Sequence, residues 1–546
     1  MKKFLLFSVL VSVFLFIGVT AFAGQGYIIN NYGAPVLWDA SATDPIAVHP
    51  EGGACGRFAN SEMLTRLTSN LGQWANLTDL DLAFSITSGV VEGVDYCNYT
   101  DYLAGVLGNT TTENTNNIQD NVNPVLFDND GEIIDAATGE SNGRYTILGF
   151  ANPSGFSTDP DDDTLYTGIV DGQALFNCYC LEDADGNPAH SDCGATVFTT
   201  DDLDFTMIHE MGHFMNLDHT QINDAFSSDD DAENDDELPT MYPVSISAGS
   251  QLTPMEDDIV AVSSLYPADS FFTSGNAAST YCLVTGTLLD RFGDEMRCAD
   301  IQAIDSVDNT YNVAFVSGAY APAVDGNGDG DSADTGECTS ACGGFQLYLR
   351  PGRTYALQAA SINNTFIGGS GISPCANAQH VQCDSTITGR CTDNNTSTEC
   401  RACVDNETLV DNDNSEVIAA KISAGCTAGA TVALGDITGG SVSSVSAASK
   451  NLVKKSLKGE TPVPVPYARL LPGGEQAALS AAITCPESGG DSDDDDDNSS
   501  SSLSGCSLRP EQRMTRGTGF GFAMVMMALV CLFAGHRAIK AFSGNE

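Results

Sequence analysis

Three of the seven histidines of the chain lie within the stretch HEMGHFMNLDH, residues 209–219. In an α-helix, His209 and His213 lie one turn apart on the same side, so both imidazoles can bind a single metal ion. Zinc favours such nitrogen ligands, and a catalytic zinc site has three protein ligands and a further position for water. Glu210 lies on a neighbouring helical face, where its carboxylate can take a proton from that water without binding the metal. The stretch therefore predicts a hydrolytic metal site.

The third histidine, His219, can reach the same ion only if the helix ends soon after His213 and the chain then turns sharply. Asn216 occupies the turn, and asparagine is the best candidate other than glycine for the left-handed conformation that ends a helix. We therefore expect His209, His213 and His219 to bind one catalytic Zn²⁺ ion, with Glu210 as the general base.

These residues resemble the active site of the metzincin clan of zinc proteases, and within it that of the matrixins, whose pattern is HExxHxxGxxH followed by a methionine turn. The segment TMYP places Met241 as the methionine of that turn, and the resemblance implies that it forms an apolar floor beneath the metal. LTPMEDDIVAVSSLYP looks like the matrixin C-terminal helix, with Asp257 and Asp258 as its acidic pair. LGQWANLTDLDLAF is similar to the passage from helix to strand near the start of matrixin catalytic domains. The resemblance implies an α+β catalytic domain over residues 24–270, a twisted mixed sheet with an active-site helix.

The chain departs from the family pattern in two places. Asn216 replaces the family glycine, and we expect a small effect because asparagine tolerates the left-handed conformation. The gap between His219 and Met241 is longer than in most matrixins, and its segment DAFSSDDDAENDDEL contains eight acidic residues. That segment either binds Ca²⁺ or forms a solvated loop. DNDGEIID and EDADGNPAHSD also offer oxygen ligands.

A second domain follows, in which short alternating strands and turn signals replace the helical periodicity. CLVTGTLLDRFGDEMRCADIQAI and GGFQLYLRPGRTYALQA resemble strands of the carboxypeptidase regulatory-like β-sandwich, which implies an all-β sandwich over residues 276–372. Between them, glycines alternate with the oxygen-bearing residues Asp325, Asn327, Asp329 and Asp331. Such a loop either binds Ca²⁺ or forms a solvated turn.

The two ends of the chain are typical of an exported protein. Residues 1–23 combine two lysines, an apolar run and the small-residue site AFA, which predicts a secretory signal peptide. Residues 373–485 read as a Cys-rich extension and stalk, and 486–505 as an acidic Ser/Asp linker that cannot pack. Residues 506–546 begin with Cys506 of a Gly-Cys pair, include an apolar run at 517–535 long enough to cross a bilayer, and end in a basic tail. They resemble the C-terminal sorting signals of bacterial surface proteins, so we expect a multidomain chain that ends in a transmembrane helix.

Charge and cysteine content agree with export. A formal net charge of −51 excludes a general affinity for nucleic acid or anionic lipid. Of the 18 cysteines, 16 lie outside the sorting segment, and an even number in an exported chain predicts disulfides. Cys178 or Cys180 with Cys193 would close a short loop, and we expect Cys55 to form a disulfide, with Cys97 as a candidate partner.

The resemblance implies an exported zinc-dependent metalloendopeptidase that hydrolyses peptide bonds in protein or peptide substrates. We expect it at the bacterial cell surface, anchored in the membrane or released after C-terminal processing. The alternative is a non-catalytic, calcium-loaded surface protein that uses a protease fold for adhesion or binding. Glu210 argues against this alternative, because an adhesive module has no need of a general base.

Overall fold

A computed structural model of the chain describes residues 26–438 except for 31–32, 104–121, 139–141, 160–161, 195, 228–233, 244, 246–250, 290–294, 296–298, 321–342, 362–415 and 423–425. Several predicted segments lie outside the described residues: the signal peptide, the loop with Asp325, Asn327, Asp329 and Asp331, most of the Cys-rich extension, the acidic linker and the sorting signal.

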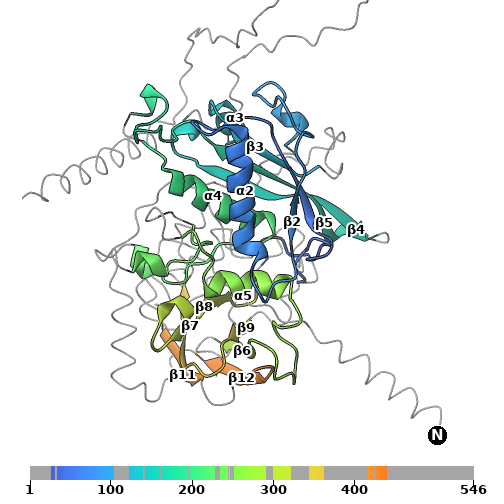
Figure 1. Cartoon of the computed structure of the whole chain (residues 1–546). Helices are drawn as coiled ribbons and strands as arrows, with labels where there is room; N and C mark the ends of the chain where they lie inside the picture. The colour runs from blue at the N-terminus through green and yellow to red at the C-terminus, as the bar shows by residue number, and fades with distance from the viewer. Residues whose placement is uncertain are drawn as a thin grey trace, which may run out of the picture.

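The first part of the chain forms a five-stranded mixed sheet with the order β2-β1-β3-β5-β4 (Figure 1). Its strands are β1 (Ile46–Pro50), β2 (Phe84–Ile86), β3 (Pro124–Asp128), β4 (Gly149–Asp159) and β5 (Asp162–Asn177). Neighbouring strands are parallel except for β4, which pairs antiparallel with β5 and lies at the edge. Side chains alternate between the faces, so Val125 and Phe127 join the core beneath α2 and α4, while Leu126 joins the core around α3 (Glu132–Thr138).

Helix α2 (Asn60–Ala75) lies beside α4 (Thr200–Phe214) on one face of this sheet (Figure 1). Its apolar residues recur every three or four positions, which is the spacing of one helical face. The fully or nearly fully buried members of this stripe are Met63, Leu67, Leu71 and Trp74. Trp74 Nε1 donates a hydrogen bond of 2.9 Å to the backbone oxygen of Ile208, which fixes α2 against the helix that carries the histidines.

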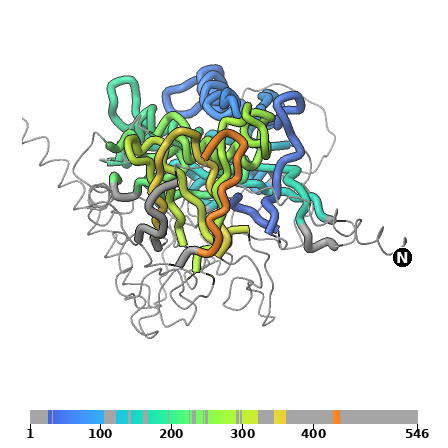
Figure 2. Tube along the Cα trace, turned by 90° about the horizontal axis from the view of Figure 1, so that it is seen from below, coloured from blue at the N-terminus to red at the C-terminus, as the bar shows by residue number. Residues whose placement is uncertain are grey.

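Two smaller sheets form a β-sandwich (Figure 2 shows their yellow and orange tubes in front of the five-stranded sheet). One sheet has the order β11-β10-β7-β8 and the other β12-β6-β9. The bounds are β6 (Cys282–Leu289), β7 (Ala299–Asp305), β8 (Val313–Val316), β9 (Gly344–Leu349), β10 (Tyr355–Ser361), β11 (Glu416–Ile422) and β12 (Thr431–Thr438). The last two strands come from the part of the chain that the sequence assigned to an extension, so the sheets include residues beyond 372.

Helix α5 (Glu256–Leu265) joins the two halves of the structure. Val260 belongs to the core of the sandwich, whereas Ala261, Val262 and Leu265 belong to the core between the five-stranded sheet and its helices. Since opposite faces of one helix enter two cores, the halves pack as one body.

The predicted fold class needs a correction. Within the described ranges, mixed sheets are accompanied by few helices, and none of these helices has both the length and the apolar character needed to cross a membrane. Residues 517–535, where we expected a transmembrane helix, lie outside those ranges. The prediction of a fold that ends in a transmembrane helix is therefore not supported.

Three disulfides stabilise the described residues, as expected for an extracellular or exported protein. Cys180 pairs with Cys193, which was one of the two predicted alternatives. The candidate pairing of Cys55 with Cys97 is wrong, because Cys55 pairs with Cys178, the residue that follows β5. The third disulfide joins Cys282 at the start of β6 to Cys426.

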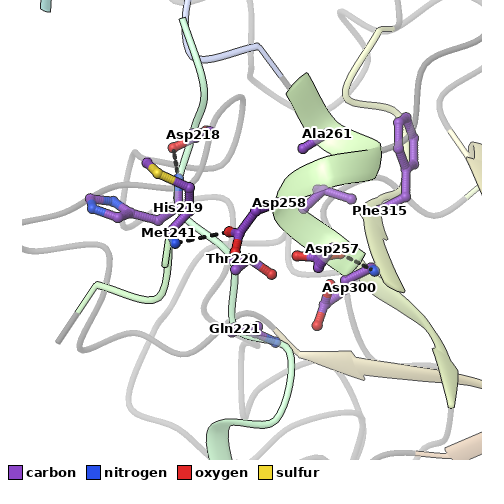
Figure 3. Close-up of a pocket in the computed structure, with 12 residues that line it drawn as sticks. Asp218, His219, Thr220, Gln221, Met241, Asp257, Asp258, Ala261, Asp300 and Phe315 are labelled. Atoms are coloured by element: carbon purple, nitrogen blue, oxygen red, sulfur yellow. Dashed lines mark hydrogen bonds between the residues drawn. The ribbon is translucent and has the colours of Figure 1, made fainter. Parts of the chain in front are cut away.

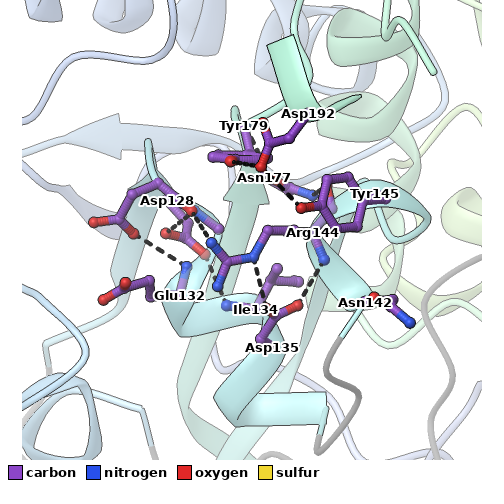
Figure 4. A network of polar contacts seen from close by, with 12 residues as sticks. Asp128, Glu132, Ile134, Asp135, Asn142, Arg144, Tyr145, Asn177, Tyr179 and Asp192 are labelled. Atoms are coloured by element: carbon purple, nitrogen blue, oxygen red, sulfur yellow. Dashed lines mark hydrogen bonds and ion pairs between the residues drawn. The ribbon is translucent and has the colours of Figure 1, made fainter. Parts of the chain in front are cut away.

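The loop DNDGEIID is organised by Asp128, the last residue of β3 (Figure 4). Its Oδ1 accepts a hydrogen bond from the N–H of Gly131 (3.0 Å), and its Oδ2 accepts one from the N–H of Ile134 (2.7 Å). Arg144 Nε donates to Asp135 Oδ2 at 2.6 Å and fixes the far side of α3. Burial raises the pKa of Asp128 above its usual range. The carboxylate thus connects β3 to α3, and backbone N–H groups take up both of its oxygens.

We expect Asp128→Ala to lower the free energy of unfolding by about 2–4 kcal/mol, because two buried N–H groups would lose their acceptor. Asp95→Ala is the matched control, since the exposed Asp95 side chain accepts one hydrogen bond of 2.8 Å from the N–H of Cys97. Its cost should stay within about 0.5 kcal/mol. Denaturant unfolding of the full chain measures both values, and equal losses for the two variants would contradict this role of Asp128.

Candidate metal centre

Helix α4 begins at a capping box. The Thr199 side chain accepts a hydrogen bond from the N–H of Asp202 (3.1 Å), and Asp202 Oδ2 accepts one from the N–H of Thr199 (2.8 Å). This exchange satisfies two N–H groups that have no partner within a helix. Asp201 and Asp202 also place negative charge in the first turn, where the helix dipole favours it. The sequence before the histidines therefore fixes where their helix starts.

The helix ends at Phe214, as the turn at Asn216 requires. Asn216 has a φ of 72°, which confirms the predicted left-handed conformation. Its N–H donates to the carbonyl of His213 (2.8 Å), and the N–H of Leu217 donates to the carbonyl of Gly212 (3.0 Å). This turn sends the chain back toward the helix, so that His219 can meet the two helical histidines.

The three predicted ligands come together in the structure. The Nε2 atom of His209 lies 3.1 Å from that of His213 and 3.2 Å from that of His219, and the His213 and His219 Nε2 atoms are 3.0 Å apart. All three side chains are buried. Within the described ranges, these three histidines lie close enough to one another to hold a metal ion.

Hydrogen bonds at the opposite ring nitrogens decide where the protons are. His209 Nδ1 donates to the carbonyl of Thr240 (2.7 Å), and His213 Nδ1 donates to the carbonyl of Leu217 (2.8 Å). A carbonyl oxygen can only accept, so Nδ1 carries the proton and Nε2 presents a lone pair. Burial lowers the pKa of His209 to about 3 and that of His213 to about 4, which keeps both rings neutral at pH 7.

This arrangement fits a bound metal ion. Unprotonated nitrogens so close together repel each other unless a cation lies among them. Four ligands arranged tetrahedrally around zinc with bonds of 2.0–2.1 Å would place their nitrogens about 3.3 Å apart. The observed separations of 3.0–3.2 Å are close to that value. His209, His213 and His219 can therefore hold a metal ion together.

Met241 lies directly against the helix that carries two of the ligands. Its side chain is 2% exposed, and its sulfur fills the space that a Cβ on Gly212 would need. Trp74 borders the same space. Glycine at position 212, between the two helical histidines, therefore allows the methionine to approach the backbone of α4.

Asp258 supports the site from α5 (Figure 3). Its Oδ2 accepts hydrogen bonds from the N–H groups of Thr240 and Met255, both at 2.8 Å, and its Oδ1 accepts one from the N–H of Met241 (2.9 Å). The carbonyl of Thr240 in turn orients His209. Sequence reasoning missed Thr240 and Leu217, because each acts through a backbone carbonyl that leaves no signal in residue type.

Glu210, the predicted general base, is 2% exposed. Its Oε2 accepts a hydrogen bond of 2.8 Å from the N–H of Ala151 in the edge strand β4. Burial raises the pKa of Glu210 to about 8, although the Ala151 N–H acts in the opposite direction. The carboxyl group is thus held in one orientation by the backbone of β4.

A small cavity lies between the candidate metal centre and the sandwich, and four aspartates are among the residues that line it (Figure 3). Its lining includes His219 and Met241 on one side and Asp257, Asp300 and Phe315 on the other. Asp257 Oδ1 accepts a hydrogen bond of 2.7 Å from the N–H of Ala314 in β8. Asp257 therefore binds strand β8 of the sandwich, while Asp258, the other residue of the acidic pair, binds the methionine turn.

No protein-family model matches this chain, and no curated protein matches it in sequence. The interpretation of the centre therefore depends on its residues and their geometry.

We expect the full chain to bind one equivalent of a divalent metal and His213→Ala to weaken binding by more than about 100-fold, since even outer-shell partners of a ligand contribute 10–100-fold. His190→Ala is the control, because His190 stacks on Tyr179 at a centroid distance of 4.2 Å and takes no part in the triad. Competition with a chromogenic chelator gives both affinities. A comparable loss in the control would show that the triad is not the metal site.

Asp257→Asn should change the pH dependence of stability. Burial, together with the charges of Asp258 and Asp300, raises the pKa of Asp257 from 3.8 to about 8. A carboxyl group with a raised pKa binds more protons when folded, so its contribution is complete below pH 3.8 and is lost as the pH rises through about 8. Asparagine keeps an acceptor for the Ala314 N–H and carries no charge. We therefore expect the Tm of the variant, relative to wild type, to be higher at pH 8 than at pH 5; the same difference at both pH values would argue against a charged, buried Asp257.

Proposed function

We propose that this chain is an exported zinc-dependent metalloendopeptidase with a metzincin-like, and more narrowly matrixin-like, active site. The observation that carries the proposal is the convergence of three buried imidazoles, with Nε2 atoms 3.0–3.2 Å apart, on a helix and turn that also carry Glu210. The positions of Met241 and Asp258 agree with the family pattern that the sequence resembles, and Asn216 makes the turn at the place of the family glycine. Three disulfides support export, for which residues 1–23 would serve as the signal peptide and the cell surface or medium as the destination.

Zinc held by His209, His213 and His219 would polarise the carbonyl of the scissile peptide bond and make a water molecule in the site more acidic. Glu210 would accept a proton from the attacking water and deliver it to the leaving amine. The Ala151 N–H fixes the carboxyl group for both transfers. Because β4 is the edge strand of its sheet, an extended peptide could lie along it beside Glu210, which favours protein and peptide substrates.

Glu210→Gln should lower kcat/KM on a protein substrate by at least about 10²–10⁴-fold, the usual contribution of general acid–base catalysis. The amide keeps an oxygen for the Ala151 N–H, so we expect the variant to fold and to bind metal as wild type does. Glu51→Gln is the matched control, because Glu51 is another buried glutamate that accepts a backbone N–H, that of Phe127 at 3.3 Å. A peptide library digested with the full chain, with and without chelator, measures cleavage.

Undiminished cleavage by Glu210→Gln would rule out the role given to this residue. A wild-type chain that binds zinc stoichiometrically and cleaves nothing in the library would favour the alternative, a calcium-loaded adhesion or binding protein. The Ca²⁺ sites proposed for that alternative, at Asp325, Asn327, Asp329 and Asp331, can be tested separately by calcium titration.

A further inference from the structure

Asn216 does more than adopt the left-handed conformation. It is fully buried, and its side chain makes three hydrogen bonds to the N-terminal part of the chain. Oδ1 accepts from the N–H of Ile28 (2.6 Å), and Nδ2 donates to the carbonyls of Ile28 (3.0 Å) and Val36 (2.7 Å). A glycine would satisfy the backbone conformation equally well and would make none of these bonds. The asparagine therefore has a structural task that the family glycine cannot perform.

The backbone next to this side chain holds the same N-terminal segment, residues 26–28. The N–H of Tyr27 donates to the carbonyl of Asn216 (2.9 Å), and Gly26 forms an antiparallel bridge with Leu217. At the far side, the N–H of Gly26 donates to the hydroxyl of Tyr320, a residue of the sandwich (3.0 Å). The segment is thus held between the turn after α4 and the sandwich.

Leu217 connects this segment to the metal centre. Its carbonyl accepts the Nδ1 proton of His213 (2.8 Å), and that bond sets both the tautomer and the orientation of the ring. The Tyr27 ring lies 6.5 Å from the His213 ring, measured between centroids. A shift of residues 26–28 would therefore move the peptide that aims His213 at the metal.

We propose that residues 26–28 are a structural part of the metal centre. In this proposal Asn216 is a positioning residue, whose hydrogen bonds hold these residues against the turn that orients His213. Metal retention then depends on a segment that lies far from the histidines in sequence. The inference rests on the metal-binding part of the proposed function and is independent of whether the chain cleaves peptides.

Asn216→Gly removes the side-chain hydrogen bonds to residues 28 and 36 without straining the backbone. We expect Zn²⁺ affinity to fall about tenfold, the lower end of the effect of losing an outer-shell partner. The amides of Tyr27 and Ile28 should also exchange hydrogen faster, because their acceptors are loosened or removed. Both measurements use the full chain, with chelator competition for affinity and mass spectrometry for exchange.

Asn223→Gly is a closely matched control. Asn223 also has a positive φ, of 63°, and is buried. Its side chain likewise makes three hydrogen bonds: to the carbonyls of Glu237 (2.6 Å) and Asn309 (3.3 Å), and from Asn312 Nδ2 (2.7 Å). Loss of these bonds should reduce thermal stability and leave Zn²⁺ affinity unchanged, which separates a role in positioning from a general loss of stability.

Unchanged Zn²⁺ affinity in Asn216→Gly, with or without faster exchange at residues 27 and 28, would overturn the inference, as would an equal loss of affinity in Asn223→Gly. If Asn216→Gly does not fold, Tyr320→Phe carries the test, because it removes the acceptor for Gly26 at the other side of the segment. In that case, faster release of Zn²⁺ to chelator supports the role of residues 26–28 in metal retention, and an unchanged rate refutes it. A chain that binds zinc but shows no proteolysis would disprove the proposed enzyme and leave these measurements valid.

Discussion

Three imidazole nitrogens that present lone pairs to one point inside a protein repel one another, and a cation is what makes such an arrangement favourable. The structure commits the rings to this geometry through Nδ1, which donates to the carbonyl of Thr240 in His209 and to that of Leu217 in His213. With those protons fixed, the Nε2 atoms of His209 and His213 have none to share across their separation of 3.1 Å. Binding of a metal ion by these histidines would therefore be linked to correct folding around them, because the segments that hold the two carbonyls must be in place.

Those segments come from distant parts of the sequence. Asp258 in α5 binds the N–H groups on either side of the Thr240 carbonyl, and residues 26–28 hold the peptide of Leu217. Each orienting carbonyl is thus supported by a chain segment that helix α4 does not contain. This explains why a short motif can supply ligands and still be insufficient for a rigid site: the ligands are local in sequence, whereas their orientation depends on tertiary structure.

The same distinction separates what the sequence could predict from what it could not. The offset of four residues places His209 and His213 on one side of any helix, and Asn216 is one of few residue types that permit the turn to His219, so residue type alone predicts the triad. The carbonyls of Thr240 and Leu217 carry no such information. The partner of Cys55 depends on β5 ending beside residue 55, which only the order of strands in the sheet reveals. Strands β11 and β12 were missed for a similar reason, since they enter sheets begun by strands far earlier in the chain.

The sandwich was predicted as a second domain, yet its contacts join it to the part of the structure that holds the candidate metal centre. Helix α5 places Val260 in the sandwich core and Val262 in the other core, and its consecutive residues Asp257 and Asp258 bind β8 and the methionine turn respectively. Arg350 of the sandwich adds an ion pair of 2.6 Å with Glu256, whose side chain is 4% exposed. Removing the sandwich would expose the Val260 face of α5 and deprive two acidic side chains of their partners, at the start of the helix that supports Thr240. Because these costs fall on one ten-residue helix, we infer that the centre and the sandwich fold and unfold together.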